Sequence, residues 1–156
     1  MRLRIVTIGR QRNGPEKDLI NDYISRFNRT GRLVGLGPAE IIELEDKKNG
    51  GKAAEAILLL KPIPASAYVV ALDERGTLQT SPEFAKKIVC IRDDAPSELF
   101  FVIGGPDGLD AEVLSRSNAR LSFGKMVWPH MLVRVMLTEQ LYRAASILTG
   151  GPYHRV

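Results

Sequence analysis

Segments typical of β-strands and of α-helices alternate along the whole 156-residue chain. The apolar runs at residues 68–72 (YVVAL) and 99–103 (LFFVI) predict buried strands, because a strand covered on both faces is apolar at every position. Stretches rich in helix formers, such as residues 52–60, lie between such runs. This alternation predicts an α/β fold, in which helices cover both faces of a parallel sheet.

The same patterns give approximate bounds for each element. Strands are expected over residues 3–8, 40–44, 68–72, 99–103 and 119–123. Helices are expected over residues 16–27, 52–60, 111–115 and 129–148. One further helix is expected in the segment SPEFAKKIVCI, with Ser81 as its N-cap and Pro82 at its first position.

Length and composition favour a single domain over residues 1–156, because 44% hydrophobic residues suffice for one compact core. The basic N-terminus has too short an apolar stretch for a signal peptide, and no run approaches the roughly 18 to 20 apolar residues that span a bilayer. We therefore expect a soluble, cytoplasmic protein without a membrane partner.

The single cysteine, Cys90, lies in the apolar segment IVCI and is expected to be a buried core thiol. Two histidines and one cysteine give no metal-ligand spacing, so no metal is expected.

Positive charge is concentrated near the end of the chain. The net charge is +4, yet the segment from Val113 onward holds six basic residues against the one acid Glu139. An anionic partner would be attracted to this part of the chain. A solvated basic face is the alternative interpretation.

Two predicted strands end in turns that favour a ligand site. Residues 73–76 (DERG) follow one strand and residues 104–108 (GGPDG) follow another, and ligands of open α/β sheets bind beyond the carboxyl ends of the strands. The glycine turn lacks the G-x-G-x-x-G spacing and the P-loop ending, which disfavours dinucleotides and nucleoside triphosphates. Asp107 in the turn would repel phosphate and suits a neutral or cationic ligand. Each turn, taken singly, is also compatible with a purely structural role.

The last predicted helix is apolar on nearly every side, so it is either central or shared with a second copy of the chain; we favour a homodimer. Glu139 and Arg143 are four residues apart and are able to pair with each other.

The terminal segment GGPYHRV carries Tyr153, His154 and Arg155, which suit stacking, proton transfer and phosphate contact. Composition alone also allows an idle, frayed tail.

Together, the segments LDERG, FVIGGPDGL, WPHMLVRVMLTEQLYRA and PYHR closely resemble the ribosomal RNA large subunit methyltransferase H family, within the SPOUT superfamily of knotted methyltransferases. The resemblance covers the whole chain. It implies a C-terminal trefoil knot and a homodimer. The implied activity is transfer of a methyl group from S-adenosylmethionine to N3 of a pseudouridine in a 23S ribosomal RNA stem-loop, on the assembled ribosome.

The resemblance also assigns site residues. The cofactor is expected to bind at Leu72, Gly104, Gly105, Phe123, Gly124, Lys125, Met126, Val127 and Trp128. The imide N3–H must lose its proton during transfer, and His154 is the natural base, with Tyr153 and Arg155 as its catalytic neighbours. RNA contacts are expected at Arg134, Arg143 and Arg155. His130, just after Pro129, is interpreted as structural. The rival hypothesis is a non-catalytic ribosome-binding or assembly factor with the same fold.

Overall fold

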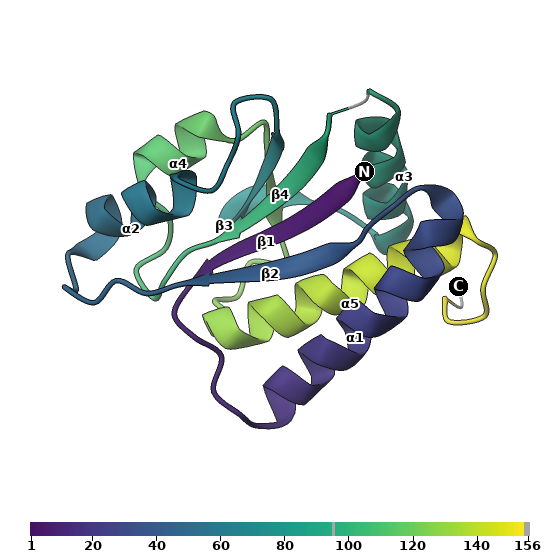
Figure 1. The fold of residues 1–156 in the computed structure, drawn as a ribbon, viewed down its shortest axis with the longest axis horizontal. Helices are drawn as coiled ribbons and strands as arrows, with labels where there is room; N and C mark the ends of the chain where they lie inside the picture. The colour runs from purple at the N-terminus through teal and green to yellow at the C-terminus, as the bar shows by residue number, and fades with distance from the viewer. Residues whose placement is uncertain (95, 155–156) are drawn as a thin grey trace.

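The computed structural model describes residues 1–94 and 96–154. At its centre lies a five-stranded sheet of order β2-β1-β4-β3-β5, in which every neighbouring pair of strands is parallel (Figure 1). Its strands are β1 (Arg2–Ile8), β2 (Ala39–Leu44), β3 (Tyr68–Leu78), β4 (Glu98–Ile103) and β5 (Ala119–Ser122). The helices are α1 (Pro15–Gly31), the short 3-10 helix η1 (Arg32–Val34), α2 (Gly51–Leu60), α3 (Ser81–Asp93), α4 (Ala111–Arg116) and α5 (His130–Leu148). The predicted α/β fold is confirmed, and the trefoil knot stays a prediction.

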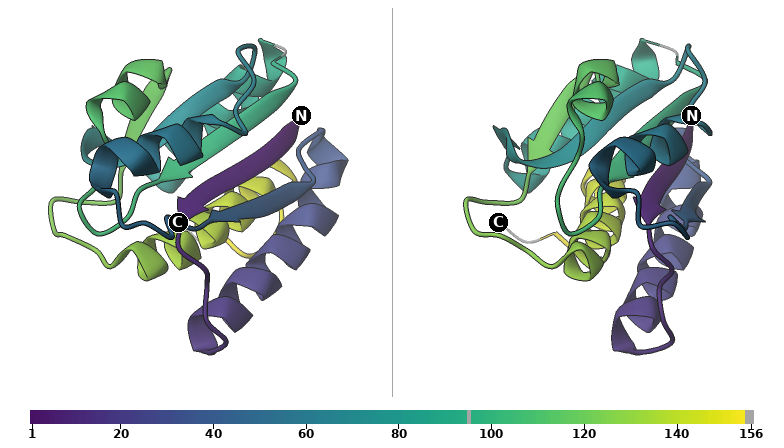
Figure 2. Two further views of the ribbon diagram at one scale, coloured as in Figure 1. Left: turned by 60° about the vertical axis from the view of Figure 1, so that its left-hand side comes forward. Right: turned by 90° about the vertical axis from the view of Figure 1, so that its left-hand side faces the viewer.

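Helices cover both faces of the sheet, as the apolar strands predicted (Figure 2). In β4, Leu99 and Phe101 point into a core shared with α1, α3 and α5, whereas Phe100 and Val102 point into a second core beneath α2 and α4. Because successive side chains of a strand point to opposite faces, β4 contributes to both cores and must be apolar throughout.

Strand β3 extends to Leu78, six residues beyond the bound predicted from its apolar run. Both Leu72 and Thr77 pair with Leu121 of β5, so residues 73–76 form a bulge between two paired stretches. Gly76 permits this crossing, because a Cβ atom there would lie 2.7 Å from the backbone of Leu121. The turn predicted over 73–76 is therefore a bulge within a longer strand.

Helix α3 corrects two predictions. Its N-cap is Thr80, not Ser81: the Thr80 hydroxyl accepts from the Glu83 N–H at 3.4 Å, and the Glu83 carboxylate accepts from the Thr80 N–H at 2.7 Å. The predicted buried thiol of Cys90 is exposed. The buried stripe of α3 runs through Phe84, Ala85, Ile88 and Ile91, which leaves Cys90 on the outer side.

Helix α5 packs against α1, α3 and the sheet of its own chain, and α1 lies alongside it (Figure 1). Leu137, Leu141 and Ala145 are fully buried in this contact. Part of the apolar surface that suggested a second copy is thus covered within one chain, and the homodimer stays a prediction. In residues 1–94 and 96–154, no helix combines the length and apolar character needed to cross a membrane.

Candidate active site

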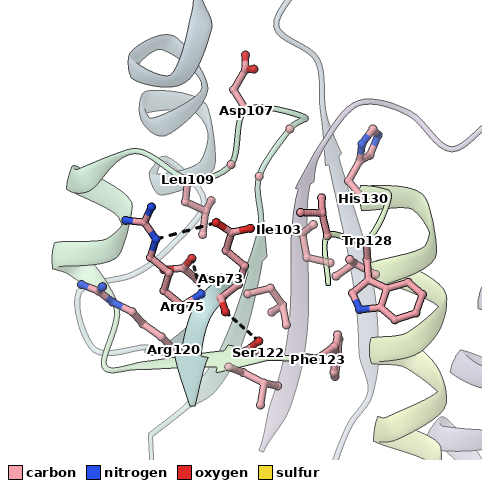
Figure 3. Close-up of a pocket in the computed structure, with 18 of the residues that line it drawn as sticks. Asp73, Arg75, Ile103, Asp107, Leu109, Arg120, Ser122, Phe123, Trp128 and His130 are labelled. Atoms are coloured by element: carbon pink, nitrogen blue, oxygen red, sulfur yellow. Dashed lines mark hydrogen bonds and ion pairs between the residues drawn. The ribbon is translucent and has the colours of Figure 1, made fainter. Parts of the chain in front are cut away.

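A cavity of about 540 Å³ opens at the bulge of β3 and at the carboxyl ends of β4 and β5 (Figure 3). Leu72, Ile103 and Ser122 line it from these three strands. Residues 73–75, 104–108 and most of 123–128 complete the wall. This volume lies in the range of small-molecule sites, about 300 to 1,000 Å³. The structure thus brings together the three segments that the sequence had singled out.

Gly104, Gly105 and Gly108 give the turn a floor of backbone atoms. A Cβ atom on Gly104 would lie 2.8 Å from the carbonyl oxygen of Gly108, so any larger residue would force the turn open. The turn closes on itself, because the Gly108 N–H donates to the Gly105 carbonyl at 3.0 Å and Gly108 adopts φ +78°. A ligand in the cavity therefore meets backbone atoms here.

Glu55 of α2 supports the glycine turn from behind. Burial raises the pKa of Glu55, and the nearby carboxylates of Asp46 and Asp107 raise it further. The backbone N–H of Gly105 opposes this shift, because it favours the charged carboxylate. Helix α2 is thus linked to the cavity floor by one partly buried acid.

Ser122 connects two walls of the cavity. Its hydroxyl lies 3.1 Å from the carbonyl oxygen of Glu74 in the bulge and 2.9 Å from that of Gly124, and it accepts from the Gly124 N–H at 3.2 Å. The bulge and the 123–128 segment are therefore held at a fixed separation.

Charges of both signs line the cavity (Figure 3). Asp73 and Asp107 contribute carboxylates, while Arg75 and Arg120 contribute guanidinium groups. The Arg75 side chain is 85% exposed, so it stands at the solvent side. A ligand that carries both positive and negative groups matches this lining better than a polyphosphate.

Comparison with known proteins places this architecture in a family. A family model described as "Predicted SPOUT methyltransferase" matches residues 1–154. The chain belongs to the SPOUT methyltransferase family. It is 60% identical over the full length of both chains to ribosomal RNA large subunit methyltransferase H of Dinoroseobacter shibae, and 58% identical over the full length to the protein of that name from Ruegeria pomeroyi. The recognition made from sequence motifs is confirmed.

A solved structure supports the fold of this SPOUT family member. A probable methylase family protein from Haemophilus influenzae superimposes with a TM-score of 0.55, covering 99% of this chain and 70% of the other, at 17% identity. At that identity the likeness speaks for the fold alone.

Eight of the nine residues predicted to bind the cofactor line the cavity. They are Leu72, Gly104, Gly105, Phe123, Gly124, Met126, Val127 and Trp128. Lys125 is exposed and does not contribute to the lining. Its neighbours Met126 and Val127 are also largely exposed, so this segment forms the outer lip of the cavity.

His130, interpreted from sequence as structural, also lines the cavity. Burial lowers the pKa of its imidazole, and the nearby guanidinium of Arg134 lowers it further. A neutral imidazole thus faces the site from the first turn of α5. The sequence signal that would have placed His130 in the site is its position next to residues 123–128.

Arg134 does not lie on the RNA-facing surface that was predicted for it. The side chain is 1% exposed and donates to the Ile8 carbonyl at 2.6 Å and to the Gln11 side chain at 3.4 Å. Glu43 lies 3.7 Å away as its ionic partner. These contacts make Arg134 a buried support between β1, β2 and α5, and the prediction of an RNA contact is corrected.

Arg143 pairs with Glu139, as the spacing allowed, at 2.6 and 3.0 Å. Tyr153 of the tail lies on this pair instead of hanging free, and neither Tyr153 nor His154 lines the cavity of its own chain. Arg155 lies outside the described residues. The frayed tail of the sequence interpretation is thus replaced by a segment that folds back on α5.

A second cavity of about 610 Å³ shares Leu121, Ser122 and Phe123 with the first and extends along α5 toward Glu139 and Arg143. It is somewhat larger, but it lies beside the helices and lacks the glycine turn. Within the described part of the chain, no group of three His, Cys, Asp or Glu side chains is arranged to hold a metal ion.

Proposed function

We propose that the protein is an S-adenosylmethionine-dependent methyltransferase that modifies N3 of a pseudouridine in 23S ribosomal RNA on the assembled ribosome. The observation that carries this proposal is the cavity at the β3 bulge and the ends of β4 and β5, in a chain 60% identical to a ribosomal RNA large subunit methyltransferase. A cytoplasmic location follows from that substrate.

The lining of the cavity suits the cofactor. Gly104 and Gly105 line it without side chains of their own, so a ligand is able to approach their backbone closely. Leu72 and Ile103 offer apolar surface for the adenine. Asp73 and Asp107 suit the ammonium and sulfonium groups, while Arg75 and Arg120 suit the carboxylate. When bound, S-adenosylmethionine supplies an electrophilic methyl group.

The task left to the protein is to hold the acceptor in line and to remove one proton. Alignment of two reacting atoms contributes several kcal/mol in well-positioned reactions, up to roughly 7 to 11. The imide N3 must lose its proton as the nitrogen–carbon bond forms, and the His154 imidazole is the group proposed to accept it. Tyr153 and Arg155 are proposed to contact the RNA beside it.

A homodimer completes the site in this proposal. His154 does not line the cavity of its own chain, so the tail of one copy is proposed to serve the cavity of the other. The second cavity offers an open groove for the contact between the two copies. Its lining includes the apolar side chains Leu19, Leu78, Val135 and Met136.

Mass spectrometry of 23S ribosomal RNA from cells that lack the protein tests this function. We expect one N3-methyl group to disappear from a modified uridine and to return on re-expression. Unchanged methylation, together with no shift of the melting temperature by S-adenosylmethionine, would favour the non-catalytic ribosome-binding alternative.

A further inference from the structure

The C-terminal segment is held on α5 through Tyr153. The Tyr153 hydroxyl donates to Oε1 of Glu139 at 2.9 Å, although the two residues are 14 positions apart. The ring also contacts two residues about one helical turn after Glu139: the Tyr142 ring centroid is 4.6 Å away, and the Arg143 guanidinium carbon lies 4.7 Å from the Tyr153 ring centroid. Polar, aromatic and cation–π contacts thus converge on one side chain.

Glu139 is the centre of this arrangement. Its Oε1 accepts from Arg143 at 2.6 and 3.0 Å in addition to Tyr153, and its Oε2 accepts from the Gln140 amide at 2.7 Å. The Glu139 side chain is only 16% exposed, so its hydrogen bonds are largely shielded from water. Burial raises the pKa of Tyr153, and the neighbouring Tyr23 and Glu139 raise it further, so the phenol remains a donor at physiological pH.

The chain between α5 and Tyr153 is also fixed. Gly150 adopts φ +69°, and the Gly151 N–H donates to the Ser146 carbonyl at 2.7 Å, which reverses the chain direction after the helix. The segment is therefore attached at both ends, at the helix terminus and at Tyr153.

The attachment lies beside the groove that leads to the cofactor cavity. Glu139 and Arg143 line the second cavity at one end, and Phe123 lines both cavities at the other. A tail fixed here starts from a defined point on the groove, whereas a tail free from Leu148 onward would sample many directions. Restricting it in advance lowers the entropic cost of ordering it in the reaction.

We propose that Glu139 is a positioning residue for methyl transfer: with Arg143 and Tyr142 it holds Tyr153 on α5 and so fixes the point from which His154 reaches the RNA base. This inference rests on the proposed function. Glu139 itself touches neither cofactor nor base, and it acts through the tail.

The first arm of the test measures the attachment without any activity. Carboxypeptidase digestion of the purified full chain, followed by mass spectrometry, reports how fast Tyr153 is released. We expect Glu139→Ala to accelerate release of Tyr153 about 10-fold, since a hydrogen bond and an ion pair are lost. Tyr153→Phe keeps the ring contacts and loses the hydroxyl, so residue 153 should be released at a rate between those of the wild type and Glu139→Ala. Glu45→Gln, which removes the exposed pair with Arg10 at 3.1 Å, is the matched control and should digest like the wild type.

The second arm measures single-turnover methylation of ribosomes from cells that lack the protein. For Glu139→Ala we expect the rate at saturating ribosomes to fall about 10-fold, while affinity for S-adenosylmethionine stays within about two-fold. Glu139→Gln keeps an acceptor oxygen for Tyr153 and should recover part of the rate. A merely structural role would lower cofactor affinity and melting temperature together and would give no recovery with glutamine.

The outcomes separate this inference from the proposed function. Unchanged digestion of Glu139→Ala overturns the attachment, and faster digestion with unchanged methyl transfer overturns the positioning role. If Glu139→Ala does not fold, Tyr153→Phe decides the attachment and Glu139→Gln decides the positioning role. Absence of methylation by the wild type would contradict the proposed function and with it the positioning role, whereas the digestion arm would still report on the attachment.

Discussion

A Cβ atom on Gly105 would lie 2.7 Å from Oε1 of Glu55, whereas one on the adjacent Gly104 would lie 2.8 Å from the backbone oxygen of Gly108. The two distances are nearly equal, but the obstacles differ. A carboxylate at the end of a flexible side chain is able to move away, and a backbone carbonyl inside a closed turn is not.

The two alanine variants should therefore differ in S-adenosylmethionine affinity. We expect Gly105→Ala to weaken binding about 3- to 10-fold and Gly104→Ala to weaken it about 100-fold, or roughly 1 and 3 kcal/mol. Isothermal titration calorimetry measures both. Adding Glu55→Ala should restore affinity to Gly105→Ala but not to Gly104→Ala. If the two single variants lost the same affinity, the backbone conformation of the turn would limit binding, and the atoms that each Cβ meets would not.

Glu55 should also make stability depend on pH. Its pKa is raised in the folded chain above the ordinary value of 4.5, mainly by burial. Its contribution to stability is thus fully present below pH 4.5 and is lost as pH rises through the higher folded value. Glu55→Gln lacks this loss, so urea unfolding should show the variant gaining on the wild type between pH 4.5 and 7. A constant difference across that window would contradict the prediction.

Substitutions of Arg134 and Arg120 should separate stability from cofactor binding. Arg134→Leu removes the guanidinium that donates to the buried Ile8 carbonyl and pairs with Glu43, and we expect a loss of about 3 to 5 kcal/mol in the free energy of unfolding. Exposed Arg120 lines the cavity, so Arg120→Gln should leave stability within about 0.5 kcal/mol. It should weaken S-adenosylmethionine binding, because it removes one of the two guanidinium groups proposed to face the cofactor carboxylate. If Arg134→Leu had normal stability and weakened RNA binding, the RNA contact that the sequence predicted for Arg134 would be supported after all.

His154→Ala should reduce the single-turnover rate about 100-fold, with partial recovery as pH rises and the imide ionises unaided.

Mixing a tail-deleted chain with a Gly104→Trp chain tests the cross-subunit site, because one heterodimer site would combine an intact cavity with an intact tail. Activity should return on mixing. Verified heterodimers without activity would mean that each tail serves its own cavity.

Light scattering at micromolar concentration should give twice the 17.3 kDa of one chain. Met136→Glu places a charge in the second cavity and should shift the protein toward the monomer. A wild-type mass near 17.3 kDa would contradict the homodimer.

Local patterns predicted the sheet, because a buried parallel strand such as β4 must be apolar on both faces. They stopped β3 too early, because Asp73–Gly76 has turn composition and only the pairing with β5 shows that the strand resumes. Arg134 and Arg143 look alike in sequence, yet one is buried and the other pairs with Glu139, a difference set by which helix face meets the sheet. The folded-back tail depends on contacts across 14 residues that spacing does not reveal.

The close crossing of Gly76 over Leu121 limits how this enzyme scaffold is able to diversify. A side chain at position 76 would wedge β3 from β5, and the Ser122 hydroxyl fixes the distance between the bulge and the following segment. Insertions in residues 73–76 would therefore disrupt the sheet edge itself. The Met126 and Val127 lip has no such constraint, since both side chains are largely exposed. Attempts to change substrate preference by loop grafting should thus succeed at the lip and fail at the bulge.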